Sequence, residues 1–192
     1  LWQIAALAEK HDLVVCSDEI HNGLLLDPGC RHRVFATLSP ELAARTITLM
    51  APSKTYNIPG LGAAFAIISD PALRRRFHAA MHGIVPHVNA LGMAAMEAAL
   101  AQCDDWHAAL LDYLRGNART LERTVAALPG LDMRPIEATY LAWIDARDFA
   151  ADHGVDNPVR HFEQHGLGLS DGAEFGAPGF VRLNFGTRRV LL

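Results

Sequence analysis

Lys54 has a sequence context in which its amine could act as a nucleophile. Lys54 follows an apolar run and precedes a loop rich in proline and glycine, and it is one of only two lysines among 17 basic residues. Because the chain otherwise uses arginine for positive charge, this lysine points to the chemistry of an amine. A partly desolvated lysine favours its neutral form, which is a nucleophile and forms a Schiff base with a carbonyl compound. The alternative is an ordinary surface lysine in a loop.

A second stretch, Asp18-Glu19-Ile20-His21, follows another apolar run. Asp18 would be the first side chain there to face a ligand, and the alternative is an aspartate that caps a turn. A metal site of Asp18, Glu19 and His21 is disfavoured, because adjacent carboxylates at a strand end point apart and no dense ligand cluster joins them. Two histidine pairs at helical spacing lack a third ligand, so we expect no metal; the pairs are His78 with His82 and His161 with His165.

Apolar patterning predicts the elements that must position these side chains. A helical pattern covers residues 1–10, and short apolar runs predict strands at 13–17, 46–50 and 63–68. Continuous runs of this length are typical of parallel strands covered on both faces. A helix followed by such strands indicates an α/β domain, whose ligands bind at the carboxyl ends of the strands. Asp18 and Lys54 both follow such ends.

The rest of the chain has a different pattern. Helix-forming residues cover 71–82 and 89–128 and end at Pro129-Gly130. Beyond them we expect a strand over 139–145, a helix starting at Asn157-Pro158 and a last strand over 179–185. This order predicts the back part of a large α/β domain over residues 1–80, connecting helices over 81–128 and a small α+β domain over 129–192.

Composition limits the classes of partner. The chain has 192 residues, of which 51% are hydrophobic, and a net charge of −4. There is no basic stripe, so we expect no nucleic acid partner, and the apolar runs are too short to span a membrane. The three cysteines form no Cys-x-x-Cys pair, which favours a reduced, cytoplasmic environment.

Several motifs, in order, resemble one enzyme family along nearly the whole chain. The motifs are DEIH at 18–21, LDPG at 26–29, SKTYNIPGLG at 53–62, TYLAW at 139–143, LSDG at 169–172, FG at 175–176 and VRLNFG at 181–186. Together they resemble the MalY/PatB-type C–S lyases, which are cystathionine β-lyase-like relatives of the class I/II aminotransferases. The resemblance implies a fold-type I enzyme that uses pyridoxal phosphate, with this chain as its carboxy-terminal portion.

The resemblance implies a role for each residue at the cofactor. Lys54 would be the Schiff-base lysine and would also move protons. Asp18 would pair with the pyridine nitrogen of the cofactor and keep it protonated. His21 stands where many aminotransferases have a tyrosine near the phenolic oxygen, which favours the lyase branch. Ser53 would help to hold the phosphate.

Two further residues would contact the substrate. Arg182 would bind the α-carboxylate of an amino acid as a bidentate fork, which arginine does better than lysine. Tyr140 would line the substrate cleft, and its alternative is a tyrosine of the core or of an interface.

The chain also departs from the family pattern. Many aminotransferases have serine three residues before the lysine and arginine eight residues after it, where this chain has Ala51 and Gly62. The family's glycine-rich phosphate loop belongs to an amino-terminal half that this chain does not contain. We therefore expect the chain alone to hold the cofactor poorly and to lack activity.

The implied reaction is α,β-elimination on an amino acid that carries sulfur on its β-carbon, which yields pyruvate, ammonia and a thiol. One alternative is an aminotransferase that uses the same lysine and aspartate. Another is a lyase-like protein whose main role is to bind a transcription regulator, as some relatives do. Family members are dimers, so a homodimer is expected.

Overall fold

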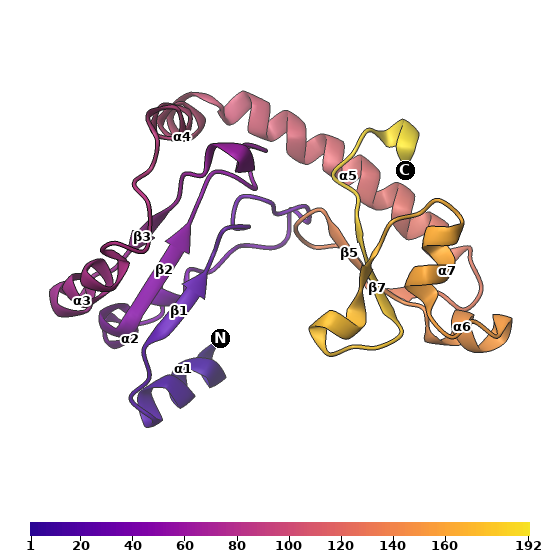
Figure 1. Ribbon diagram of the computed structural model, residues 1–192, viewed down its shortest axis with the longest axis horizontal. Coiled ribbons are helices and arrows are strands. Elements are labelled where there is room, and N and C mark those ends of the chain that lie inside the picture. The colour runs from indigo at the N-terminus through magenta and orange to yellow at the C-terminus, as the bar shows by residue number, and fades with distance from the viewer. The chain divides into compact units, whose positions relative to one another are not determined.

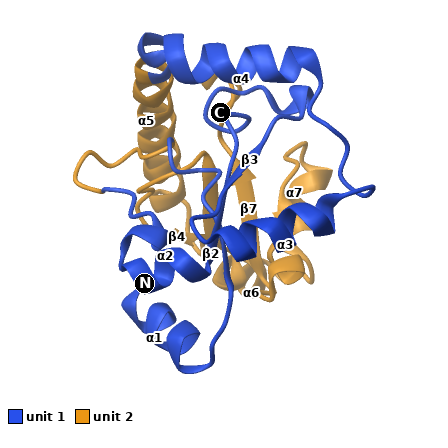
Figure 2. Cartoon of the chain, turned by 90° about the vertical axis from the view of Figure 1, so that its left-hand side faces the viewer, with its two compact units in different colours: residues 1–23, 31–107 blue, residues 24–30, 108–192 orange.

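A computed structural model describes residues 1–192 and divides them into two compact units (Figures 1 and 2). Unit 1 contains residues 1–23 and 31–107, and unit 2 contains residues 24–30 and 108–192. Each unit has a sheet of its own. The domain boundaries expected near residues 80 and 128 remain a prediction.

Unit 1 holds a three-stranded sheet in the order β1-β2-β3. Its elements are α1 (Trp2–Lys10), β1 (Val15–Asp18), η1 (Phe35–Thr37), α2 (Pro40–Arg45), β2 (Thr46–Met50), η2 (Pro59–Leu61), β3 (Phe65–Ile67), α3 (Pro71–Met81) and α4 (Ala90–Gln102). Helix α5 (Asp104–Ala126) begins in unit 1 and continues in unit 2. Strands β1 and β2 are parallel, with Asp18 opposite Leu49.

The predicted strands are present, but two of them differ from expectation. Strand β3 is short and runs antiparallel to β2. A parallel return would need a crossover, usually a helix, whereas residues 51–64 form turns and one short 3₁₀ helix. Strand β1 is not covered on both faces. Its residues alternate between half-buried and exposed, because only the Val15 side packs on Phe35 and its neighbours in α1 and α2.

Local capping explains where the helices of unit 1 begin. The side chains of Ser39, Asp70 and Asn89 accept hydrogen bonds from the first turns of α2, α3 and α4, respectively. The helical region expected over 89–128 is two helices, which meet at Cys103. No glycine or proline marks that break, but Asp104 and Asp105 provide the acidic first turn that favours a new helix start.

Unit 2 packs a four-stranded sheet, in the order β4-β5-β7-β6, against α5. The further elements are β4 (Asp132–Met133), β5 (Leu141–Asp145), α6 (Arg147–His153), α7 (Pro158–Gln164), β6 (Ser170–Asp171), η3 (Gly172–Phe175), β7 (Phe180–Asn184) and η4 (Arg189–Leu191). The strands predicted over 139–145 and 179–185 and the helix at Asn157-Pro158 are confirmed as β5, β7 and α7. The short elements β4, α6 and β6 were not predicted, because two to seven residues carry little periodic signal.

The two faces of the unit 2 sheet differ in character. Ala142 and Ile144 of β5 and Val181 and Leu183 of β7 point into the core, where they meet the apolar stripe of α5. Because side chains alternate along a strand, Trp143 and Arg182 lie on the opposite face. None of the helices is both long enough and apolar enough to cross a membrane.

Candidate active site

The parallel pairing of β1 and β2 brings two of the predicted site residues to one sheet edge. Asp18 is the last residue of β1, and β2 ends at Met50, four residues before Lys54. Since parallel strands end at the same edge, Asp18 and the Lys54 turn lie at the same side of unit 1. This is the edge at which open α/β sheets bind their ligands.

A tight turn over residues 52–57 presents Ser53 and Lys54. The backbone N–H of Tyr56 donates to Pro52 O at 2.8 Å, and that of Ile58 donates to Ser53 O at 3.0 Å. Asn57 ends the turn with φ +54°, a left-handed conformation that asparagine tolerates better than most residues. Lys54 is half-buried, and the ion pairs of the chain join other residues. Its ammonium group is therefore not committed to a carboxylate.

His21 lies within the electric field of both predicted cofactor-binding groups. Burial lowers its pKa below the usual value, the charge of Lys54 lowers this pKa further, and the charge of Asp18 raises it. The imidazole is therefore neutral at pH 7, when it can make hydrogen bonds without adding a second positive charge beside Lys54. Asp18, His21 and Lys54 thus form one electrostatic cluster.

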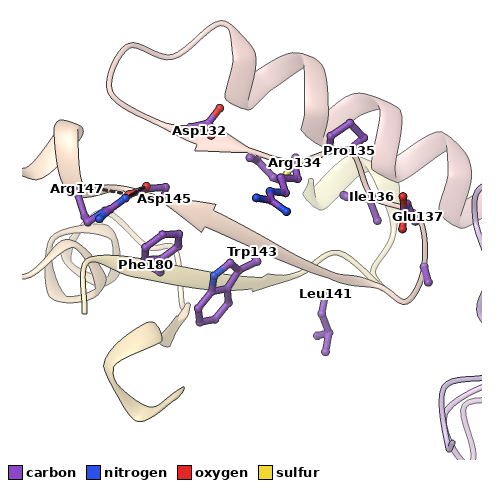
Figure 3. Close-up of a pocket in the computed structure, with 12 residues that line it drawn as sticks. Asp132, Arg134, Pro135, Ile136, Glu137, Leu141, Trp143, Asp145, Arg147 and Phe180 are labelled. Carbon is purple, nitrogen blue, oxygen red and sulfur yellow. Dashed lines mark hydrogen bonds and ion pairs between the residues drawn. The ribbon is translucent and has the colours of Figure 1, made fainter. Parts of the chain in front are cut away.

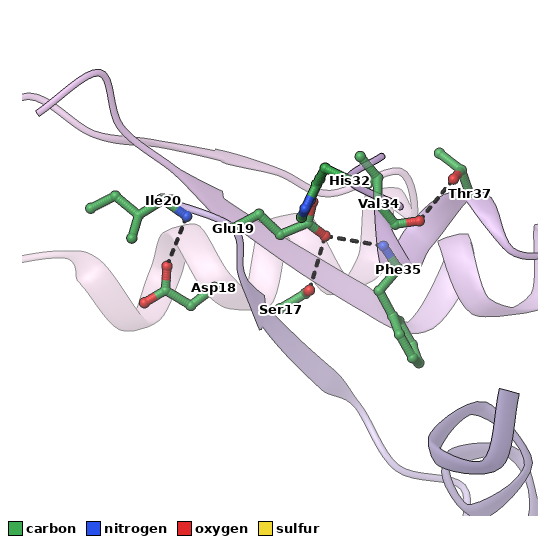
Figure 4. Close-up of polar contacts among 8 residues, drawn as sticks. All are labelled: Ser17, Asp18, Glu19, Ile20, His32, Val34, Phe35 and Thr37. Atoms are coloured by element: carbon green, nitrogen blue, oxygen red, sulfur yellow. Dashed lines mark hydrogen bonds and ion pairs between the residues drawn. The ribbon is translucent and has the colours of Figure 1, made fainter. Parts of the chain in front are cut away.

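The two carboxylate oxygens of Asp18 have different surroundings. Its Oδ1 accepts a hydrogen bond from the Ile20 N–H at 3.1 Å, which fixes the turn after the strand (Figure 4). The side chain is exposed, and no hydrogen bond engages Oδ2. Asp18 thus caps the turn through Oδ1, as the alternative interpretation predicted, and Oδ2 remains available to a ligand.

Glu19 anchors this edge, a role that the sequence analysis did not predict. The carboxylate is only 4% exposed. Its Oε1 accepts hydrogen bonds from Ser17 Oγ at 2.9 Å and from the Phe35 N–H at 3.1 Å, and its Oε2 lies 2.7 Å from His32 Nε2 (Figure 4). This carboxylate is fully used inside the protein, and no group of side chains in the chain could hold a metal ion. The signal in the sequence was its place beside Asp18 at a strand end.

A second contact joins the two turns that carry the site. A Cβ atom at Gly23 would lie 2.7 Å from the side chain of Thr55, and the Gly23 carbonyl lies 2.6 Å from His107 Nε2. Tyr56 packs on His107 and stacks on Trp106, with ring centroids 5.6 and 6.1 Å apart, respectively. A cavity of about 160 Å³ is lined in part by Gly23, Thr55, Tyr56 and His107. The sequence analysis missed these contacts, because they join residues far apart in the chain, 84 positions in the case of Gly23 and His107.

The predicted substrate residues belong to unit 2. Arg182 is half-buried on β7, and its guanidinium forms none of the chain's ion pairs. Tyr140 precedes β5, packs against the hydrophobic core, and has its pKa raised by burial. Thr139 beside it has φ +67°, which is rare for a β-branched residue. Such strain is concentrated at functional sites, which supports a place for Tyr140 in the substrate cleft. The packing of Tyr140 against the hydrophobic core supports the alternative, a core residue.

A separate pocket of about 540 Å³ opens on the exposed face of the unit 2 sheet (Figure 3). Trp143 and Phe180 form its floor, and Arg134 and Glu137 lie along its rim. Arg147 closes one end through a bidentate pair with Asp145, with the closest contact at 2.6 Å. The pocket contains none of the predicted site residues.

Comparison with known proteins identifies the family. The model of the class I and II aminotransferases matches residues 1–191, and the chain belongs to this family. It is 34% identical to cystathionine β-lyase PatB of Bacillus subtilis over 97% of this chain and 49% of that protein. It is 32% identical to the protein MalY of Escherichia coli over 98% of this chain and 48% of that protein. The chain thus spans about half the length of the curated relatives it matches.

Solved structures agree with this assignment. The crystal structure of OvoB is 50% identical, with a TM-score of 0.93 over 97% of this chain and 48% of that chain. Cystalysin from Treponema denticola, whose structure contains pyridoxal 5′-phosphate, is 30% identical, with a TM-score of 0.87 over 99% of this chain and 49% of that chain. The predictions of the C–S lyase and aminotransferase family, of the fold-type I architecture and of pyridoxal phosphate as cofactor are confirmed.

The residues at the unit 1 edge suit this cofactor. The amine of Lys54, which has no carboxylate partner, could bond to the carbonyl carbon of the cofactor. The free oxygen of Asp18 could accept a hydrogen bond from its protonated ring nitrogen, and the neutral imidazole of His21 could bind its phenolic oxygen. Ser53 could contact the phosphate. The assignment of Lys54, Asp18, His21 and Ser53 to the cofactor remains a prediction, as do Arg182 and Tyr140 for the substrate.

Proposed function

We propose that the full-length protein is a pyridoxal phosphate-dependent C–S β-lyase. Its substrate class would be amino acids with sulfur on the β-carbon, and its products would be a thiol, pyruvate and ammonia. Support comes from the relatives whose names include cystathionine β-lyase, and from the intact lysine, aspartate and histidine of the unit 1 edge.

In this proposal each residue of the chain has a defined task. The bound cofactor supplies an electron sink for the charge that develops at the substrate Cα. Lys54 Nζ would hold the cofactor until the substrate amine displaces it, and the freed amine would then take the Cα proton. The bond between Cβ and sulfur would break, the electron pair would leave with the sulfur, and the proton on Lys54 would pass to the sulfur to give the thiol. Asp18 Oδ2 keeps the ring nitrogen protonated. Hydrolysis of the remaining three-carbon fragment gives pyruvate and ammonia.

His21 and Arg182 orient rather than react. A neutral His21 offers a hydrogen bond to the phenolic oxygen of the cofactor without competing with Lys54 as a positive charge. Arg182 would bind the α-carboxylate with two parallel N–H donors and so hold the amino acid in one orientation. In the same proposal the protein is a homodimer, as is expected for its family.

The observation that carries the proposal is the cluster of Lys54, His21 and Asp18 at the shared end of β1 and β2. The test uses the full-length protein loaded with pyridoxal phosphate and supplied with L-cystathionine, without a keto acid. Steady release of pyruvate is expected, and Lys54→Ala should abolish it. Lys10→Ala, which alters the only other lysine, should leave the rate unchanged. Turnover that persists in Lys54→Ala would overturn the proposal.

An aminotransferase is the second candidate. It is favoured by the family model and by 26% identity to an asparagine–oxo-acid transaminase of Streptococcus mutans. The same residues would serve, but the proton would return to a different carbon. Turnover that requires an added keto acid, with no pyruvate in its absence, would identify this reaction.

A further inference from the structure

Arg182 is flanked on both sides by residues of neighbouring strands. Within the unit 2 sheet it pairs in register with Trp143 of β5 on one side and with Ser170 of β6 on the other. The face that carries it points away from the core packed on α5. Its surroundings are therefore set by a sheet and not by a loop, which favours a defined orientation.

Two contacts hold the guanidinium group. Its central carbon lies 4.5 Å from the centroid of the Phe175 ring, and Nη2 donates a hydrogen bond to Ser170 Oγ at 3.2 Å. Phe175 in turn meets the edge of Trp143, with ring centroids 5.8 Å apart and planes at 82°. Neither contact neutralises the positive charge, since an aromatic face and a hydroxyl group are both uncharged.

The short helix that supplies Phe175 is itself tightly positioned. Asp171 Oδ1 accepts from the Ala173 N–H at 2.9 Å and caps η3. A Cβ at Gly172 would lie 2.5 Å from backbone oxygens, so only glycine fits there. Gly176 ends the helix with φ +78°. These features explain the Ser-Asp-Gly and Phe-Gly motifs, which the proposed reaction leaves without a role.

A second arginine on the same face provides a contrast. Arg147 lies 4.9 Å over the Phe180 ring, but its Nε and Nη2 both donate to the Asp145 carboxylate, which neutralises its charge. Arg182 has the same type of aromatic support and no acidic partner. A guanidinium has five N–H donors, and Ser170 engages one nitrogen. Arg182 is thus oriented with its charge and most of its donors available to an external carboxylate.

We propose that Phe175 and Ser170 are positioning residues, which orient Arg182 so that it binds the α-carboxylate of the substrate. This inference rests on the proposed function, because that function assigns the carboxylate to Arg182. Stacking on the ring fixes the plane of the guanidinium, and the Ser170 hydroxyl fixes its rotation within that plane. Two parallel N–H bonds to a carboxylate require both to be fixed.

The test measures preference for a carboxylate, independently of turnover. Binding of 3-(methylthio)propionate and of its uncharged amide to the full-length protein is compared by calorimetry, and the ratio of the two affinities is the readout. Phe175→Leu should lower this ratio about 2- to 5-fold, the value of one cation–π contact. Ser170→Ala should lower it in the same direction. Phe180→Leu removes the ring that supports Arg147 and leaves the ring that supports Arg182, so it is the matched control and should leave the ratio unchanged.

The effect must also depend on Arg182. In an Arg182→Gln background, Phe175→Leu should produce no further change in the ratio. The inference is overturned if Phe175→Leu and Phe180→Leu act alike, or if the wild-type protein does not prefer the carboxylate. Absence of pyruvate formation by the wild-type protein would overturn the proposed reaction instead, while the binding ratio would still report on Arg182. A thermal melt of each variant identifies loss of fold. If Phe175→Leu does not fold, the affinity ratio measured for Ser170→Ala decides whether the inference holds.

Discussion

The side chain of Thr55 lies so close to Gly23 that a Cβ atom at position 23 would be 2.7 Å from both Thr55 Cγ2 and Thr55 Oγ1. Thr55 follows Lys54 directly, and Gly23 lies two residues after His21. The contact therefore joins the turn after β1 to the turn after β2. His107 strengthens the junction through its 2.6 Å contact with the Gly23 carbonyl. The candidate cofactor site depends on two loops that touch where only glycine fits.

Gly23→Ala should destabilise the full-length protein by about 1–3 kcal/mol, because the added methyl group forces packed atoms apart. The backbone at Gly23 does not require a positive φ, so the cost is steric. Chemical denaturation measures it. Gly60→Ala is the matched control, since a Cβ at Gly60 meets nothing within 4 Å, and it should change the free energy of unfolding by less than about 0.5 kcal/mol.

The cost of Gly23→Ala should also shrink in a Thr55→Ala background, which removes both crowded atoms. An equal cost in the two backgrounds would show that Thr55 is not the obstacle and would contradict the junction.

Glu19→Ala should destabilise the protein by about 1–3 kcal/mol, because the Phe35 N–H and the His32 ring lose their partner inside the protein. Glu97 on α4 is an exposed glutamate, and Glu97→Ala should cost less than about 0.5 kcal/mol. Parallel urea titrations of the two variants compare the costs. Equal midpoints would mean that the Glu19 network contributes nothing to the stability of this edge.

The elements of the fold were predictable where their signals are local. Caps such as Asp70 and Asn157 and the apolar stripe of α5 mark helices within a few residues. The antiparallel direction of β3 was not predictable from its own residues, because strand direction depends on the connection before it. The residues of the candidate site likewise divide into those with a local signal in the sequence and those that depend on long-range contacts.

Lys54 and Asp18 were identified from residue type and position after an apolar run. Glu19 was considered only as part of a disfavoured metal site with Asp18 and His21. Its hydrogen-bond network was not predicted, because its partners His32 and Phe35 lie 13 and 16 positions away. His107 is 84 positions from Gly23. Contacts of this range are made by tertiary packing, for which a single sequence gives no periodic pattern.

Asn117→Ala should destabilise the protein by about 1–3 kcal/mol, because it leaves two carbonyl oxygens and the Nε–H of Arg189 without a partner. Asn117 is fully buried in α5. Its Nδ2 donates to Phe185 O at 3.0 Å and to Thr187 O at 2.9 Å, and its Oδ1 accepts from Arg189 Nε at 3.0 Å. These bonds fasten the chain directly after β7, the strand that carries Arg182.

Thr124→Ala is the control for Asn117, since Thr124 is exposed on the same helix and bonds only to the preceding turn. It should change the free energy of unfolding by less than about 0.5 kcal/mol. Thermal melts that fail to separate the two variants would contradict the anchoring role of Asn117.

The pKa of His21 should respond in opposite directions to its two charged neighbours. Burial is the largest cause of its lowered pKa, followed by the charge of Lys54, while Asp18 raises the pKa. Lys54→Met removes a positive charge at similar volume and should raise the pKa of His21, and Asp18→Asn should lower it further. The measurement is an NMR titration of the imidazole Cε1 proton in the cofactor-free full-length protein. Lys10→Met, at the other lysine, should leave the pKa unchanged.

The lowered pKa of His21 also fixes the sign of a stability effect. Between the folded pKa and the unfolded value of about 6.5, the unfolded state binds more protons than the native state, so stability rises with pH. The contribution of His21 is present above the unfolded pKa and is lost as the pH falls through the folded pKa. In His21→Gln, the free energy of unfolding should decline less steeply in that window than in the wild type. An unchanged slope would mean that His21 titrates alike in both states, and the electrostatic cluster with Lys54 and Asp18 would be wrong.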